Sequence, residues 1–178
     1  QTDNNLDLVV KLAYAIDPEW TLHMAAGQKT RSATYQERYL WLPMQSTGGL
    51  ADGHNYMGNP ELDPEKAREI EIGFDWSANG TTVSPRIFQR NVADYIQGTP
   101  IDSTVPSNMP IIMISNMMGG DPRPLQFTNV DASFYGLDVM WETSLTDHWG
   151  LHGVVSMVRG ERDDINDNVG VSKISFIW

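Results

Sequence analysis

The chain has 178 residues, and its 12 Lys and Arg against 23 Asp and Glu give a formal net charge of -11. This excess of negative charge argues against nucleic-acid binding, because neutralising phosphates needs a cationic face. The absence of Cys excludes disulfides, thiolate metal sites and thiol nucleophiles. The longest apolar run, residues 110–114, is far shorter than the roughly 20 residues of a transmembrane helix.

Alternation of apolar and polar side chains is the main pattern along the chain. It is clearest at residues 69–76, where Ile70, Ile72 and Phe74 alternate with acidic residues and a glycine. A strand separates two such sets onto opposite faces, whereas a helix would scatter the carboxylates around its circumference. The pattern predicts an all-β chain without helices, an antiparallel up-and-down meander of about seven strands. In chain order these are residues 6–16, 20–27, 69–76, 81–92 (interrupted by Pro85), 134–142, 151–157 and 174–178.

Two kinds of connection join the predicted strands. Three are short turns rich in Pro, Asn, Asp and Gly, at residues 17–19, 77–80 and 146–150. Two are long, at about residues 30–67 and 97–127, and loops of that length are uncommon in compact domains. Strands of about ten residues with short turns at one end and long loops at the other are typical of a transmembrane β-barrel. A soluble sandwich normally has short connections at both ends.

Tryptophans lie beside the short turns. Trp20, Trp76, Trp141 and Trp149 flank these turns, and Trp178 is the last residue. In an up-and-down meander all five fall at one end of the sheet, as an aromatic girdle at a membrane interface would. The alternative is that the indole rings pack beneath the turns of a soluble sandwich.

The acidic residues of the strands lie opposite the apolar ones. We expect Glu69, Glu71, Asp75, Asp138 and Glu142 to point into a wide aqueous lumen, where carboxylates keep their hydration. For any one strand, a solvent-exposed sheet face is the alternative. Seven strands cannot close a wide barrel, and an open sheet would leave unpaired edges and a large apolar surface. We therefore expect the chain to be a fragment of a larger barrel.

Residues 58–74 read GNPELDPEKAREIEIGF. This segment resembles the one that leads from an extracellular loop into a descending strand in TonB-dependent outer-membrane receptors. Residues 128–138 are similar to a further strand of that family, with Asp138 where Glu is usual. The resemblance covers about residues 6–168. Several segments resemble the copper-receptor branch in particular, namely residues 37–43, 46–53, 95–98 and 158–164.

The resemblance implies that residues 1–178 are part of a receptor β-barrel of about 22 strands in the outer membrane of a Gram-negative bacterium. It implies a plug domain, absent from this sequence, with substrate binding between the plug and the extracellular loops. The implied partners are outer-membrane lipid, a small metal ligand and the TonB complex, reached through the missing N-terminal part. The implied function is uptake of a scarce metal or metal complex, with copper as the first expectation and a siderophore as the second.

Methionine is unusually frequent, with nine residues. Thioether sulfur favours Cu(I) and imidazole accepts Cu(I) or Cu(II), so loops rich in both can capture copper without cysteine. The alternative is that residues 110–114 fold back into the barrel mouth, with methionine filling gaps. We expect a copper ion as the transported ligand and no covalently bound cofactor. The candidate metal ligands are His54, Met57, Met109, Met113, Met117 and Met118.

The sequence shows no combination of residues that is typical of a catalytic site. His23, His148 and His152 have no second ligand at a recognisable spacing, and the carboxylates of residues 69–75 alternate along a strand. We therefore predict that the protein is not an enzyme. Two other functions stay open, a soluble β-sandwich or small barrel that binds through two long recognition loops, and a passive porin or adhesin barrel.

Overall fold

The computed structural model describes residues 5–40 and 53–163 of the chain. In these residues the strands β1 to β7 are Leu8–Ala15, Trp20–Arg31, Tyr56–Met57, Glu65–Ala78, Thr81–Pro100, Leu125–Thr146 and Trp149–Arg162. The helical elements α1, η2 and α2 are Tyr35–Tyr39, Pro106–Asn108 and Met109–Gly119. The all-β fold class is confirmed, while the predicted strand at residues 174–178 lies outside the described residues.

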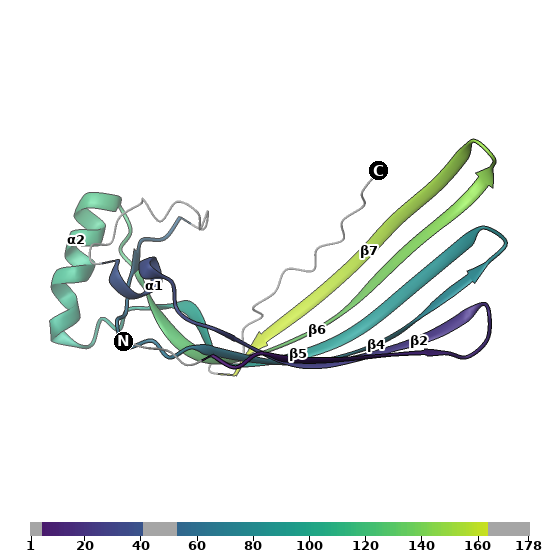
Figure 1. Cartoon of the computed structure of the whole chain (residues 1–178). Helices are drawn as coiled ribbons and strands as arrows, with labels where there is room; N and C mark the ends of the chain where they lie inside the picture. Colours follow the sequence, from purple (N-terminus) through teal and green to yellow (C-terminus); the bar gives the residue numbers. More distant parts are fainter. Residues whose placement is uncertain (1–4, 41–52, 164–178) are drawn as a thin grey trace. The chain divides into compact units, whose positions relative to one another are not determined.

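The strands form one sheet in which neighbours along the chain are mostly neighbours in space. The order is β1-β2-β4-β5-β6, β7 also pairs with β6, and the two-residue β3 runs parallel to the start of β6. The pairs β1–β2, β4–β5 and β6–β7 are antiparallel hairpins (Figure 1). This arrangement confirms the predicted up-and-down meander.

Each hairpin closes through a short turn, and the three turns lie at the same end of the hairpins in Figure 1. In the β4–β5 turn, Asn79 and Gly80 have φ angles of 52° and 73°. Two consecutive positive φ angles are those of a type I′ turn, whose twist matches that of paired strands and whose preferred sequence is Asn-Gly. The turn therefore places Ala78 opposite Thr81 and starts the register of the hairpin.

The described residues fall into two compact units. The hairpin unit contains the three hairpins, and the loop unit contains the two long connections with the adjoining ends of the strands. Their described parts are residues 5–30, 66–93 and 131–163 for the hairpin unit and residues 31–40, 53–65 and 94–130 for the loop unit.

In the hairpin unit one face of the sheet is apolar and uncovered. Ile70, Ile72 and Phe74 are 68%, 42% and 36% exposed, so no second layer of the described chain packs on them. Glu69 and Glu71 lie on the opposite face, as the period of two residues requires. An apolar face without a covering layer is expected of strands that meet lipid, and it argues against a soluble sandwich.

The same two faces continue from β4 through β5 into β6. Phe88 is the register partner of Glu71, so their side chains share a face. A Cβ atom at Gly136 in β6 would lie 2.6 Å from the ring of Phe88, which puts position 136 on that face too. Alternation then assigns Asp138 and Glu142 to it, as predicted. We call this carboxylate-bearing face the lumen face, and the apolar one the lipid face.

Aromatic rings gather on the lipid face beside the short turns. Trp20 lies against Phe74 and Trp76, with ring centroids 5.0 and 6.4 Å apart. Trp149, beside the β6–β7 turn, is 74% exposed. These positions suit an aromatic girdle, since an indole ring at a membrane interface keeps its N–H among polar groups. Trp178 lies outside the described residues.

The helices of the loop unit contradict the expectation of a chain without helices. In α2, Pro110 occupies the first turn, where its missing N–H breaks no helical hydrogen bond, and Gly120 ends the helix with a φ of 68°. The interior of α2 holds several β-branched isoleucines, which favour strands and obscure a helical pattern. No helix among the described residues has the length and apolar character needed to cross a membrane.

The strands are also longer than expected and the connections shorter. β5 and β6 have 20 and 22 residues, against the ten or so predicted. The long connections are therefore residues 32–64 and 101–124 rather than 30–67 and 97–127. Paired strands satisfy each other's backbone groups, so they continue beyond the stretch that alternation marks.

The loop unit has a small hydrophobic core of its own. Leu62 is fully buried, and Tyr56, Ile96 and Phe127 are at most 7% exposed. The rings of Tyr56 and Phe127 lie 5.0 Å apart. This core joins three segments that are distant in sequence, and it fixes the first connection against the ends of β5 and β6 within the unit.

Candidate functional site

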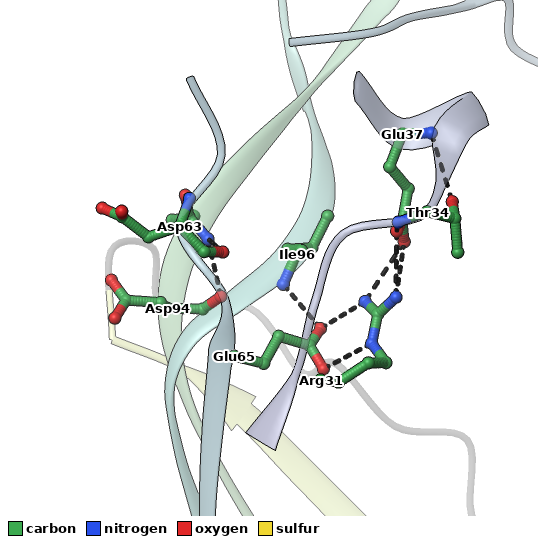
Figure 2. Close-up of polar contacts among 8 residues, drawn as sticks. Arg31, Thr34, Glu37, Asp63, Glu65, Asp94 and Ile96 are labelled. Carbon is green, nitrogen blue, oxygen red and sulfur yellow. Dashed lines mark hydrogen bonds and ion pairs between the residues drawn. The ribbon is translucent and has the colours of Figure 1, made fainter. Parts of the chain in front are cut away.

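An ion-pair network holds α1 to the strand ends of the loop unit (Figure 2). Arg31, the last residue of β2, donates from Nε and Nη2 to the two carboxylate oxygens of Glu65, at 2.7 and 2.6 Å. Its Nη1 also donates to Glu37 of α1, at 2.9 Å. Glu65 accepts a further hydrogen bond from the backbone N–H of Ile96, at 2.9 Å. One guanidinium therefore connects α1 with β2 and β4, and Glu65 extends the connection to β5.

Glu37 also caps its own helix. Its carboxylate accepts a hydrogen bond from the backbone N–H of Thr34 at 2.7 Å, while the Thr34 hydroxyl accepts from the backbone N–H of Glu37. This reciprocal pair is a capping box. Burial by itself raises the pKa of Glu37, but the hydrogen bonds from Arg31 and Thr34 outweigh it and hold that pKa below its ordinary value. The carboxylate therefore stays charged at neutral pH.

Gly58 and Asn59, the start of the GNP segment, bind the backbone around α1. The N–H of Gly58 donates to the carbonyl of Leu40 at 2.6 Å, and the N–H of Asn59 donates to the carbonyl of Glu37 at 2.8 Å. A Cβ atom at position 58 would lie 2.5 Å from the Leu40 nitrogen and 2.8 Å from the Arg38 carbonyl carbon. Only glycine permits this close approach.

Asn129 clamps the backbone where β4 and β5 enter the loop unit. Its Oδ1 accepts from the N–H of Asp63 at 2.9 Å, and its Nδ2 donates to the carbonyls of Asp63 and Asp94 at 3.0 and 2.7 Å. Asp94 has a φ of 59°, which is uncommon for a residue other than glycine. The side chain of Asn129 thus satisfies backbone groups at an irregular point that ordinary strand pairing would leave open. We call this arrangement the Asn129 clamp.

A buried polar network joins the first connection to α2. Asn55 is 1% exposed; its backbone N–H donates to Asp121 Oδ2 at 2.7 Å, and its Nδ2 donates to Ser115 Oγ at 2.9 Å. Ser115 donates in turn to the carbonyl of Asp121, and His54 Nδ1 lies 3.4 Å from the Asp121 carboxylate. Burial alone raises the pKa of Asp121, but the backbone N–H groups of Asn55 and Arg123, together with His54, hold it below its ordinary value.

The four methionines predicted as ligands in the second connection all lie on α2. Met109, Met113 and Met117 are spaced by four residues and therefore share one face of the helix. They are 44%, 58% and 82% exposed, and Met118, on an adjacent face, is 76% exposed. The structure thus brings four of the six candidate ligands together on one helix, with three thioethers in a row.

The other two candidates take different positions. His54 lies at the C-terminal end of α2, because its ring contacts Asp121 and the next residue, Asn55, packs against Gly119. Met57 lies in β3 as the register partner of Gln126. In the part of the chain that the structure describes, no three His, Asp or Glu side chains gather as they would around a metal ion.

The lumen face of the hairpin unit carries a second set of polar contacts. Arg90 pairs with Glu69, and Ser156 bonds to Asp138. Asp75 accepts from Arg86 Nη2 at 2.6 Å, and His23 Nε2 lies 2.7 Å from the other carboxylate oxygen of Asp75. His23 Nε2 has no hydrogen-bond partner among the described residues, despite this short distance. These pairs are those of a hydrated polar wall and do not form a catalytic centre.

Arg31 and Asn129 are not among the functional residues predicted from the sequence. Glu65 and Asn129 did stand in the two segments that resemble receptor motifs, but Arg31 lies 34 residues before Glu65 and had no such signal. The partners became identifiable only when the folded chain brought them together.

Comparison with known proteins gives consistent matches. The family model "TonB dependent receptor-like, beta-barrel" matches residues 2–173. The copper transporter OprC superposes with a TM-score of 0.63 and 17% identity, covering 90% of this chain and 21% of that one. The siderophore receptor PirA from Pseudomonas aeruginosa gives a TM-score of 0.64 and 17% identity, covering 88% and 28% of the two chains. No curated protein sequence matches the chain.

A third solved structure is the pyoverdine outer membrane receptor FpvA from Pseudomonas aeruginosa PAO1 bound to pyoverdine. Its TM-score is 0.60 at 13% identity, and the match covers 91% of this chain and 20% of that one. The chain therefore spans between a fifth and somewhat more than a quarter of each of these structures. At such identities the likeness shows the fold, and the match to the family model excludes the soluble sandwich.

The family model covers nearly the whole chain, and the uncovered apolar face, the hairpin order and the GNP segment agree with it. Barrels of this kind lie in the outer membrane of Gram-negative bacteria, and they are receptors and transporters rather than enzymes. This chain belongs to the family of TonB-dependent receptor-like β-barrels and forms part of such a barrel.

Proposed function

We propose that the receptor containing this chain takes up a scarce metal or metal complex across the outer membrane, with copper as the first candidate. A siderophore is the second candidate. The proposal includes two partners, the transported metal ligand and the TonB complex that powers uptake. Membership of the TonB-dependent receptor-like β-barrels supports the transport class. Similar solved structures include one copper transporter and receptors for siderophores, so the fold alone does not separate the two ligands.

The observation that favours copper is the row of methionines on α2. Residues four apart on a helix have Cβ atoms about 5–6 Å apart, so the flexible side chains of Met113 and Met117 can direct their sulfur atoms at one ion. Met109 continues the same face and supplies a third sulfur. Thioether ligands select Cu(I) over the harder divalent ions. A bulky iron–siderophore complex has no chemical need for such a row.

The buried network explains how α2 can present these sulfurs in a fixed place. Ser115 is fully buried and bonded to Asn55 and Asp121, and it lies on the side of α2 opposite Met109, Met113 and Met117. Polar anchoring on one face leaves the opposite face free for ligand. The remaining candidates, His54 and Met57, belong to the proposal as residues of the same loop unit.

The test is metal binding and uptake by the full-length receptor with Met109, Met113 and Met117 replaced by leucine. Leucine keeps volume and helix propensity but removes sulfur, so we expect Cu(I) affinity and copper uptake to fall by at least about tenfold. The matched control is Met157→Leu, which removes an exposed methionine from the lipid face.

Three other outcomes would redirect the proposal. Unchanged copper uptake in the triple variant contradicts the role of α2. Binding of a ferric siderophore in place of copper favours the second candidate. Uptake that continues in cells without TonB supports the passive porin instead.

A further inference from the structure

A hollow on the lumen face lies near the β6–β7 turn. Its volume is about 320 Å³, and residues of β5, β6 and β7 line it. The lining is mainly apolar, with Trp141, Gly153 and Val154, and it includes three side chains that can bind a transition metal: the thioether of Met140, the carboxylate of Glu142 and the imidazole of His152. The hydroxyl-bearing Thr82 and Ser84 line the same hollow.

Strand register brings these three side chains together. Glu142 and His152 are direct partners across the β6–β7 pair, and Met140 is two residues before Glu142 on the same face. The bond between Ser156 and Asp138 shows that this set of positions shares the lumen face. Directly opposite residues have Cβ atoms about 4.5–5.5 Å apart, which lets one carboxylate and one imidazole reach the same ion.

The rest of the described chain does not use these groups. Met140, Glu142 and His152 have no hydrogen-bond or ion-pair partner among the described residues. Elsewhere on the lumen face Glu69 pairs with Arg90, whereas Glu71 has no ion-pair partner among the described residues. Met140 is 53% exposed, so its sulfur is accessible from the hollow. The thioether, the carboxylate and the imidazole are therefore all available to an incoming ion.

The donor set restricts the kind of ion. One imidazole nitrogen, one carboxylate and one thioether suit a late transition metal, and copper has the highest affinity for such ligands among the divalent first-row ions. Calcium and magnesium need several oxygen ligands, of which this hollow offers one carboxylate and two hydroxyls. Water can fill the remaining positions, because the hollow is open to solvent.

We infer that Met140, Glu142 and His152 form a copper-binding site on the lumen wall, made of residues other than those of α2. It gives an ion that has entered the lumen a place to bind on the barrel wall near the short turns. The inference rests on the proposed function in one respect, since copper must enter the lumen for the site to matter in transport. Copper binding by the site itself does not depend on transport.

The test is Cu(II) titration of the full-length receptor in detergent, followed by electron paramagnetic resonance. The background carries the three leucine substitutions in α2, so those sulfurs do not contribute. We expect His152→Gln to remove a nitrogen-coupled signal and to weaken binding at this site by at least about tenfold. Glu142→Gln and Met140→Leu should weaken binding less, because each leaves the imidazole in place.

His148→Gln is the matched control, because His148 lies in the adjacent turn and does not line the hollow. Equal spectra and affinities for His152→Gln and His148→Gln would overturn the inference. Heat-modifiable gel mobility of each variant checks that the barrel has folded. If copper uptake does not respond to the α2 substitutions but the His152-dependent signal persists, the proposed function fails while this site stands. If copper uptake does not respond to the α2 substitutions and the His152-dependent signal is also absent, both the proposed function and this site are refuted.

Discussion

The loop unit and the hairpin unit place their apolar residues in opposite ways. In the loop unit, Leu62 and Ile96 are buried in a core, and charged residues are at its margin. In the hairpin unit, Ile70 and Leu12 are 68% and 59% exposed on a face that no described segment covers. One chain therefore contains a region built like a small water-soluble protein and a region built for a hydrocarbon solvent.

The two units also differ in whether their carboxylates have ion-pair partners. The side chain of Glu65 is only 11% exposed, and it is satisfied by Arg31 and by a backbone N–H. In the hairpin unit, Glu71 and Glu142 lie on the lumen face without an ion-pair partner among the described residues. A buried charge needs complete pairing, whereas a charge that faces a wet lumen does not. The loop unit therefore folds around a water-excluding core, and the hairpin unit has one face suited to lipid and one suited to water. Each unit can be tested separately.

The largest effect is expected from a cavity in the loop unit. Leu62→Ala removes a fully buried side chain, and such substitutions typically cost about 2–5 kcal/mol of stability. Hydrogen exchange of the full-length receptor in detergent should show loss of protection in residues 53–65 and 94–130. Met117→Ala, at an 82% exposed position, should leave the exchange pattern unchanged. Equal effects would mean that the loop unit has no cooperative core.

The lipid face should reject charge more strongly than the lumen face. Ile72→Arg places a cation on the lipid face, where the cost near the bilayer midplane is about 2–4 kcal/mol. Glu71→Arg introduces the same side chain one residue away on the lumen face, and we expect a much smaller loss. Urea unfolding of the receptor in lipid vesicles gives both free energies. A greater loss for Glu71→Arg would reverse the assignment of the two faces.

A smaller effect is expected at the ion-pair network. Glu65→Gln removes the charge that binds Arg31 while nearly preserving shape, and loss of such a bond costs about 1–3 kcal/mol. Hydrogen exchange should increase at α1 and around Ile96. The control is Glu61→Gln, an exposed residue of the same segment. An unchanged α1 in the Glu65 variant would show that the backbone bonds of Gly58 and Asn59 suffice.

The smallest effect is a pH dependence at the buried network. Because the pKa of Asp121 is lower in the folded protein than its ordinary value, its stabilising contribution is complete at neutral pH. The contribution is lost as the pH falls below about 4 and through the lowered value. Protection factors at residues 53–57 and in α2 should fall over that range. Asp121→Asn should remove the dependence, and its persistence there would assign it to another group, with Glu37 the next to examine.

Sequence alone predicted the hairpin unit well because its signals are local. The alternation at residues 69–76 requires only the period of a strand, and Asn79-Gly80 specifies its own turn. The faces assigned to Glu69 and Ile70 follow from the same period. Strand length was underestimated because alternation fades where β5 and β6 leave the apolar band, although their pairing continues.

The structure of the loop unit could not be predicted from local sequence patterns. Apart from the four-residue spacing of three methionines, α2 shows no helical period, because it combines Pro110 with several β-branched residues, so its helix depends on the end signals and on packing. The bonds of Arg31 to Glu65 and of Asn129 to Asp63 cross 34 and 66 residues. Such pairs depend on the register of the folded sheet. The methionines were identified from composition, but their common face became visible only with the helix.

The Asn129 clamp has a consequence for how receptors of this kind diversify. It fixes the backbone at Asp63 and Asp94 through one amide side chain, at the base of both connections. Insertions or deletions between residues 101 and 124 can then change the second connection without shifting the register of the paired strands. Grafting a foreign recognition segment between fixed anchor points is therefore a practical route to new cargo preference.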